Sequence, residues 1–349
     1  FQKTYAQGSG GVFSTTSGTS WGPKISELPN DATYGGNTDN EYTQKFGKQQ
    51  GKYYVPQRAA AGLDPWATPQ AYDNAKDFFD TGITWSNSLN VAQMLDKSSY
   101  SISLGNTHQD GIISSTGMDR YNVKVSADTK LTNNWSSGFT ANYITTSIDK
   151  AVTSGNGLLR TVYAAPPSYD LAGIPSHVDG NPYTQNSFRG SFDNAYWAME
   201  NNKFTEDTNR FFGNVYASYQ TDFGTTNHKL NAKYMVGVDA YTTHYVDSYG
   251  YGSNTGGGRG QIENYGWTNA TYNSLLTINY DWRINEDWGL NAVLGNEIIQ
   301  SNRKKYYEYG TNYNFPGWNH INNATTQQTE EETWKNRTVG FFGNVSASY

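Results

Sequence analysis

The sequence predicts an all-β fold in which long antiparallel strands cross a membrane as part of a β-barrel. Apolar and polar residues alternate with a period of two in run after run, which is typical of strands with two different faces. Short turns alternate with long connections, as in transmembrane barrels. The chain is also rich in aromatics, with 28 Tyr, 15 Phe and 10 Trp in 349 residues, although only 36% of its residues are hydrophobic.

The composition argues against several other classes of protein. The chain has no Cys, which removes disulfide scaffolds, thiolate metal sites and cysteine nucleophiles. Its formal charge of −6 gives no basic surface for nucleic acid. No apolar run of about 18 residues indicates a transmembrane helix, and the aromatic content argues against disorder. The sequence begins at Phe1 without an initiator Met, a basic n-region or an apolar h-region, so we expect no signal peptide in it, although maturation could have removed one. The last residues indicate a strand without a successor, so we expect a C-terminal truncation.

The elements follow one another in a regular order. We expect residues 1–80 to form mainly an extracellular loop, and residues 83–147 to form two hairpins. The first hairpin turns at Asp96 and Lys97, and the second turns after Leu131. Two further hairpins are predicted at 209–242 and 269–301, followed by a strand at 337–349. The connections between the hairpins are predicted at 109–118, 148–208, 243–268 and 302–336.

The predicted strands number about nine, and at roughly 10–14 residues each they are longer than typical strands of soluble proteins. That length suits a tilted membrane crossing, and the long connections would all lie on the extracellular side. Four aromatics lie next to the short turns, where a periplasmic aromatic girdle is expected: Trp135, Phe223, Trp282 and Trp288. We therefore interpret residues 1–349 as part of a single barrel domain.

One face of the alternating strands is polar, which predicts a water-filled lumen. A small soluble barrel would fill its interior with apolar side chains instead. The residues expected to face the lumen are Asn122, Lys124, Asp128, Lys233 and Asp239.

The segment Phe211–Tyr219 recurs as Phe341–Tyr349 with one change, Tyr216 against Ser346. Two copies with irregular spacing elsewhere do not make a solenoid or a propeller. We expect them to be equivalent strands of one barrel, each entering the membrane after a long loop.

Motifs for catalysis are missing from the sequence. The glycine-rich stretch from Gly250 to Gly260 lacks the Lys-Ser/Thr ending of a phosphate-binding loop, and the five histidines are far apart. We therefore expect no catalytic activity, no metal site and no cofactor.

Aromatic residues in the loops are the candidates for ligand contact. Flat rings among amides and hydroxyls suit sugars or peptides, although the same residues could stiffen the loops or anchor them at the membrane interface. The candidates are Trp66, Tyr196, Trp197, Tyr249, Tyr251, Trp267 and Trp318.

Several short motifs, in order along the chain, resemble those of one family. They are Ser20-Trp21-Gly22-Pro23, Phe78-Phe79-Asp80-Thr81-Gly82, Asn194-Ala195-Tyr196-Trp197 and Leu294-Gly295-Asn296-Glu297. In their order and spacing they resemble the SusC/RagA branch of TonB-dependent outer-membrane transporters. Ala195 departs from the Asn-Pro-Tyr-Trp segment that is usual in the family.

The resemblance implies a 22-stranded barrel in the outer membrane of a Gram-negative bacterium, of which this chain would be a middle portion of nine or ten strands. It also implies an N-terminal plug and a TonB box outside this chain, which would couple transport to the TonB complex. A SusD-like surface lipoprotein would cover the barrel, outer-membrane lipid would surround it, and an oligosaccharide or a peptide would be imported.

Two alternatives stay open. A secreted, soluble β-rich protein that binds or cleaves carbohydrate would also be rich in Tyr, Trp and Asn. It would, however, carry polar residues on the face that is apolar here. A passive porin would share the barrel and lack the plug.

Overall fold

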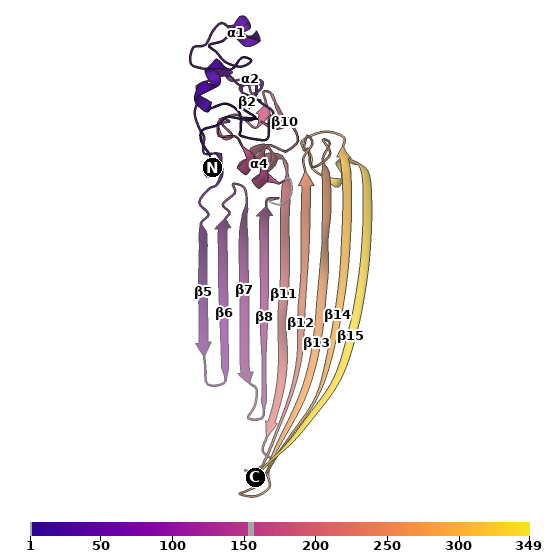
Figure 1. The fold of residues 1–349 in the computed structure, drawn as a ribbon. Helices are drawn as coiled ribbons and strands as arrows, with labels where there is room; N and C mark the ends of the chain where they lie inside the picture. Colours follow the sequence, from indigo (N-terminus) through magenta and orange to yellow (C-terminus); the bar gives the residue numbers. More distant parts are fainter. Residues whose placement is uncertain (1, 153–156) are drawn as a thin grey trace.

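The computed structural model describes residues 2–152 and 157–349. Nine antiparallel strands form one curved sheet in the order β15-β14-β13-β12-β11-β8-β7-β6-β5, and a small lobe lies at one end of it (Figure 1). Among the described helices, none has the length and apolar character needed to span a membrane.

Each strand of the sheet pairs with its neighbours in an unbroken register. The strands are β5 (Thr84–Met94), β6 (Ser98–Asp110), β7 (Gly117–Lys130), β8 (Trp135–Lys150), β11 (Lys203–Thr221), β12 (His228–Tyr249), β13 (Gln261–Arg283), β14 (Gly289–Tyr313) and β15 (Ala324–Ser348). The prediction of about nine strands in an antiparallel sheet is confirmed. The short turns lie at the end of the sheet away from the lobe.

Because the register is continuous, alternate residues stay on one face across all nine strands. The first face, which we call the apolar face, carries Ile102 opposite Val125 and Val215 opposite Val236. On β12 its apolar run extends from Leu230 to Ala240, and similar runs occur on the neighbouring strands. Such a band is typical of the lipid-facing surface of a transmembrane barrel.

The strands of the second half of the sheet are longer than predicted. β11 to β15 contain 19, 22, 23, 25 and 25 residues, against the predicted 10–14. Beyond the apolar band both faces are polar, so the alternation disappears from the sequence while the backbone ladder continues. The predicted connections 243–268 and 302–336 accordingly shorten to residues 250–260 and 314–323.

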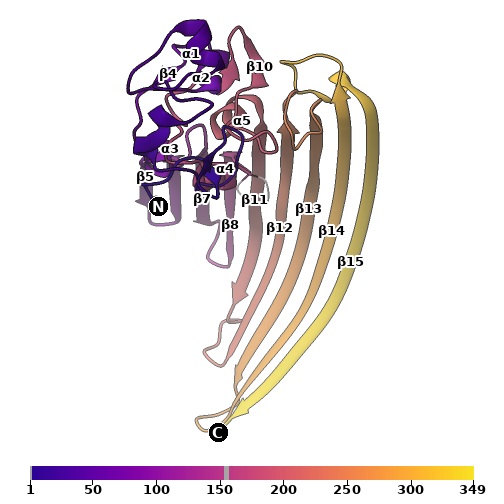
Figure 2. The ribbon, with the colours of Figure 1, turned by 45° about the horizontal axis from the view of Figure 1, so that its top comes forward.

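The segments before β5 and between β8 and β11 fold together into what we call the lobe, residues 2–82 and 157–202. Figure 2 shows the lobe beside the ends of β5 to β8, with β11 to β15 curving away. Its helices are η1 (Ile25–Asn30), α1 (Glu41–Phe46), α2 (Pro56–Ala60), α3 (Asn74–Phe78), α4 (Leu158–Ala164) and α5 (Ala195–Asn201). Its strand pairs are β1 (Gly8–Ser9) with β2 (Val12–Phe13), β3 (Tyr53–Tyr54) with β4 (Trp66–Ala67), and β9 (His177–Val178) with β10 (Asn181–Gln185).

A hydrophobic core joins the two segments of the lobe. Leu28 from the first segment and Val162, Leu171, Phe188 and Trp197 from the second are almost completely buried in one cluster. Both segments were predicted as extracellular loops. The structure adds that they form one folded body, held by contacts between residues more than a hundred positions apart.

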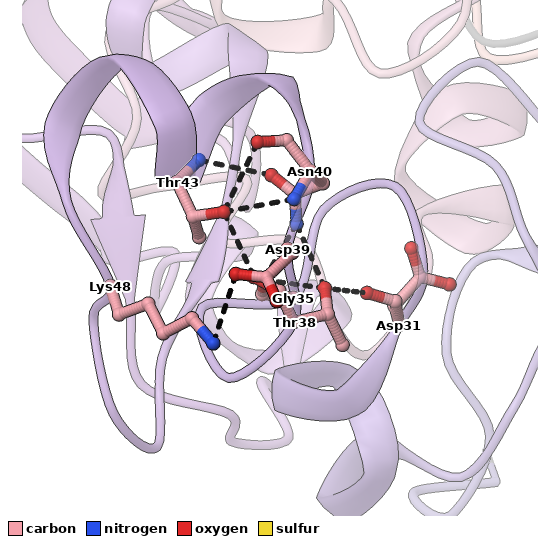
Figure 3. Close-up of polar contacts among 7 residues, drawn as sticks. All are labelled: Asp31, Gly35, Thr38, Asp39, Asn40, Thr43 and Lys48. Carbon is pink, nitrogen blue, oxygen red and sulfur yellow. Dashed lines mark hydrogen bonds and ion pairs between the residues drawn. The ribbon is translucent and has the colours of Figure 1, made fainter.

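Polar side chains order the outer part of the lobe (Figure 3). Asn40 caps α1, because its side chain accepts hydrogen bonds from the backbone N–H groups of Tyr42 and Thr43, both at 3.0 Å. The Thr43 hydroxyl accepts in return from the Asn40 N–H at 2.9 Å, which completes a capping box. An ion pair of 3.0 Å between Lys48 and Asp39 closes the loop after the helix.

The two copies of the repeated segment lie in β11 and β15. Phe211 and Phe341 are on the apolar face, and Phe212 and Phe342 are on the opposite face. The repeat therefore places the same residues on the same faces of two strands. β15 follows a connection of only ten residues, 314–323, which includes η2 (Ile321–Asn323), so the expected long loop before it is not observed.

Candidate functional site

Four aromatic side chains form a row across the polar face, near the lobe end of the sheet. We call them the aromatic ladder: Tyr245 of β12, Tyr265 and Trp267 of β13, and Tyr307 of β14. Tyr245 lies opposite Tyr265, and Tyr265 lies opposite Tyr307 in the strand register. The rings of Tyr245 and Tyr265 stack at 4.8 Å with an interplanar angle of 6°, and Trp267 is 5.5 Å from Tyr245.

The ladder lies beyond the apolar band. On β12 the apolar run ends at Ala240, and Tyr245 follows five positions later on the opposite face. At about 3.3 Å of rise per residue, this places the ring roughly 16 Å further along the strand. All four ring systems are partly exposed. The ladder therefore offers flat apolar surfaces to water rather than to lipid.

Charged side chains surround the ladder. The Lys150 ammonium lies 4.7 Å from the centre of the Tyr245 ring and 3.4 Å from the Glu206 carboxylate. On the other side, the Arg303 guanidinium lies 5.2 Å from the centre of the Trp267 ring. Such cation–ring contacts orient both groups and keep the cations above the polar face.

Hydrogen bonding fixes the central ring. The Tyr265 hydroxyl donates to the Asp247 carboxylate at 3.0 Å. This bond and the stacking on Tyr245 hold the ring at two points, so its orientation is fixed. Aromatic planes of this kind stack on the apolar faces of sugar rings or on peptide side chains, and the neighbouring carboxylates and cations can bind polar groups.

A cleft of about 230 Å³ adjoins the ladder at the base of the lobe. Lys150, Phe204 and Tyr249 line it from the sheet, and Asp193 and Met199 line it from the lobe. Lys150 borders both the cleft and the ladder, so the two form a continuous surface.

The five residues predicted to face the lumen lie together on the polar face. The strand register aligns Lys124 of β7 with Asp239 of β12, through Asn142 of β8 and Phe212 of β11. The same face of the sheet carries Asn122, Asp128 and Lys233. That this face borders a lumen stays a prediction, because the sheet is open.

Several of these five residues take part in polar contacts across strands. The Tyr216 hydroxyl donates to Asp128 at 2.6 Å, and the Lys233 ammonium lies 4.2 Å from the Tyr216 ring centre. Arg210 donates two hydrogen bonds to Asp239, at 2.8 and 2.6 Å. The polar face is therefore ordered by its own side chains.

The seven aromatics predicted to contact ligand are not gathered at one place. Trp66 and Trp197 are buried in the lobe, where Trp197 Nε1 donates to the Pro182 carbonyl at 3.0 Å. Tyr196 packs edge-on against Phe78 at 5.3 Å. The structure gives these three side chains packing roles, and a ligand contact by them stays untested.

The side chains of the other four candidates are at least partly exposed. Tyr249 lines the cleft, and Tyr251 packs against the small cluster of Ile262, Tyr313 and Ala324. Trp318 stacks on His320 at 5.0 Å between ring centres and is 44% exposed. Only Trp267 belongs to the ladder.

Tyr245, Tyr265 and Tyr307 were not among the seven candidates of the sequence analysis. All three were assigned to the predicted connections 243–268 and 302–336. The signal that identifies them is the strand register, which brings residues 62 positions apart to one row. Within residues 2–152 and 157–349, no group of three or more His, Asp or Glu side chains is arranged to hold a metal ion.

The fold is similar to that of the RagAB peptide importer. For its "closed-closed" state the TM-score is 0.64 at 15% identity, covering 80% of this chain and 32% of that chain. For the "open-open" state the TM-score is 0.62 at the same identity, covering 80% and 31%. A further structure of the RagAB peptide transporter gives 0.61. The chain thus spans about a third of the length of these chains.

No family model matches the chain, and no curated protein does so either. At 15% identity, the likeness to the importer chains establishes the fold and not the ligand. The nine strands are folded like a part of the transmembrane barrel of an outer-membrane transporter, as the sequence predicted.

Proposed function

We propose that this chain is part of a TonB-dependent transporter that imports an oligosaccharide or a peptide across the outer membrane of a Gram-negative bacterium. The observation that carries the proposal is the aromatic ladder on the polar face, outside the apolar band. The similarity to RagAB peptide importer chains supports the same class of function.

In this account the apolar face contacts outer-membrane lipid and the polar face borders the import path. The lobe and the adjoining strand ends are on the extracellular side. A ligand is held first at the ladder, where Lys150 and Arg303 flank the rings. It then moves along the polar face past Arg210 and Asp239.

Two partners follow from the resemblance found in the sequence. A SusD-like surface lipoprotein would cover the ligand on the extracellular side, and the TonB complex would release it by moving a plug. The TonB complex would act through segments of the transporter outside these 349 residues.

The ladder can be tested with an adjacent pair of tyrosines on β14. Tyr307 is on the ladder, whereas Tyr306 is on the opposite face, next to His244. Uptake of labelled peptides and oligosaccharides is measured in cells with the full-length transporter carrying Tyr307→Ala or Tyr306→Ala. Since one stacked ring contributes about 0.5–1.5 kcal/mol, Tyr307→Ala should raise the half-saturating concentration about 2- to 12-fold.

Tyr306→Ala should leave that concentration unchanged. Equal effects of the two variants would contradict a ligand contact at the ladder. Uptake that continues without the TonB complex would instead support a passive porin, and uptake of neither ligand class would contradict import of a glycan or a peptide.

A further inference from the structure

Three cations form a patch on the outward side of β14 and β15. They are Lys304 of β14 and Lys335 and Arg337 of β15, which we call the outer cation patch. All three share the apolar face with Ile298 and Val339, and all three are exposed. On β15, Arg337 is the next residue on this face after Val339, and Lys335 follows it.

The patch therefore begins where the lipid-facing band ends. On β14 the band ends at Ile298, and Lys304 follows after Gln300 and Asn302 on the same face. Long cationic side chains at this level lay their methylene stems along apolar surface while their charges reach the headgroup layer.

On the other described strands, the outward positions within six residues of the end of the band carry no Lys or Arg. They include Asp119 of β7, Asp207 of β11 and His108 of β6, which pairs with Asp119 at 2.8 Å. The whole chain has a formal charge of −6, so its composition does not explain a gathering of cations.

Among the described residues, a carboxylate pairs with one of the three cations. Lys304 pairs with Glu331 at 2.8 Å, in a pair whose side chains are 55% and 60% exposed. Arg337 donates two hydrogen bonds to the neutral Gln300 Oε1. Among residues 2–152 and 157–349, no carboxylate lies within ion-pair distance of Lys335 or Arg337.

We propose that the outer cation patch binds the phosphate groups of anionic lipid in the outer leaflet of the membrane. Arg and Lys are the side chains that bind phosphate best, and two hydrogen bonds to Gln300 orient the Arg337 guanidinium. The inference rests on the proposed outer-membrane location and is independent of the imported ligand.

The test uses the full-length transporter purified from outer membranes in mild detergent. Binding of bisphosphorylated lipid A is measured by native mass spectrometry and compared with binding of dephosphorylated lipid A. The variants are Lys304→Gln, Lys335→Gln and Arg337→Gln, singly and together. The matched control is Lys305→Gln, since Lys305 neighbours Lys304 on the polar face.

Each neutralised charge should weaken binding of the phosphorylated lipid about fivefold, and the triple variant about 100-fold. The control should bind as the unmodified protein does. Binding to the unmodified protein should also weaken as salt is added, a result that needs no variant to fold.

Three outcomes would overturn the proposal: equal binding of both lipids, unchanged binding by a folded triple variant, or competition by millimolar inorganic phosphate, which would indicate a site for a free anion. Each leaves the uptake assay on Tyr307 unaffected, so this inference and the proposed function can fail separately.

Discussion

Two buried tyrosines of the lobe give opposite predictions for the same substitution. Tyr53 is 3% exposed and donates its hydroxyl hydrogen to the Ser168 carbonyl at 2.8 Å. Tyr169 is 4% exposed, and its hydroxyl has no hydrogen-bond partner among the described residues. Replacing each by Phe removes one hydroxyl and keeps the ring.

The expected magnitudes follow from what each hydroxyl leaves behind. Tyr53→Phe leaves the Ser168 carbonyl buried without its donor, which costs about 1–3 kcal/mol. Tyr169→Phe removes a buried polar group without a partner, so it should be neutral or stabilise the lobe by about 1 kcal/mol.

The assay must report on the lobe rather than on the barrel. Hydrogen exchange of the lobe amides in the full-length protein gives the free energy of its opening. A loss of 1–3 kcal/mol corresponds to roughly 5- to 150-fold faster exchange in Tyr53→Phe. Equal destabilisation by the two variants would refute the assignment of these hydroxyls.

Three further predictions concern the lobe and the sheet. Burial raises the pKa of Tyr53 and Tyr169. Their contribution to lobe stability is therefore complete below pH 10 and is lost as the pH rises through their folded pKa values. Hydrogen exchange at the lobe amides, corrected for its intrinsic pH dependence, should accelerate over that rise in pH, and a flat profile would contradict this burial. Phe188→Ala should destabilise the lobe by about 3–5 kcal/mol because the side chain is completely buried. Proteolysis of native cells would detect this loss of stability as cleavage within residues 157–202. Resistance equal to that of the unmodified protein would argue against this core. Leu276→Arg on the apolar face should cost about 2–4 kcal/mol of membrane insertion, whereas Leu275→Arg on the polar face should cost little. The heat-modifiable fraction on gels measures this difference, and equal fractions, or a smaller fraction for Leu275→Arg, would contradict the face assignment.

The sequence predicted the part of each strand that alternates. From Leu230 to Ala240, apolar residues recur at every second position, and the structure confirms a strand with one apolar face there. From Thr242 to Ser248 both faces carry polar groups, so nothing in the local pattern separates a strand from a loop. The extension is held by backbone pairing with β13, which is not visible without the register.

The lobe and the ladder escaped prediction for a related reason. Leu28 meets Val162 and Phe188 in one core, and no local turn or periodicity indicates such a contact. Tyr245 becomes part of a site only because Tyr265 and Tyr307 lie opposite it in neighbouring strands. The faces of the strands were predictable from two-residue periodicity, whereas the site depended on pairing between distant segments.

The most direct test of the account is the water accessibility of alternate residues along β12 in intact outer membranes. These 349 residues contain no Cys, so single cysteines can be introduced into them without a background from this segment. The polar-face positions are Lys233, Met235 and Asp239, and the apolar-face positions are Tyr234, Val236 and Val238. The account predicts that a water-soluble thiol reagent labels cysteines at the first three positions and not at the second three. Equal labelling at all six, or labelling of the second three alone, would contradict a barrel whose apolar face contacts lipid and whose polar face contacts water.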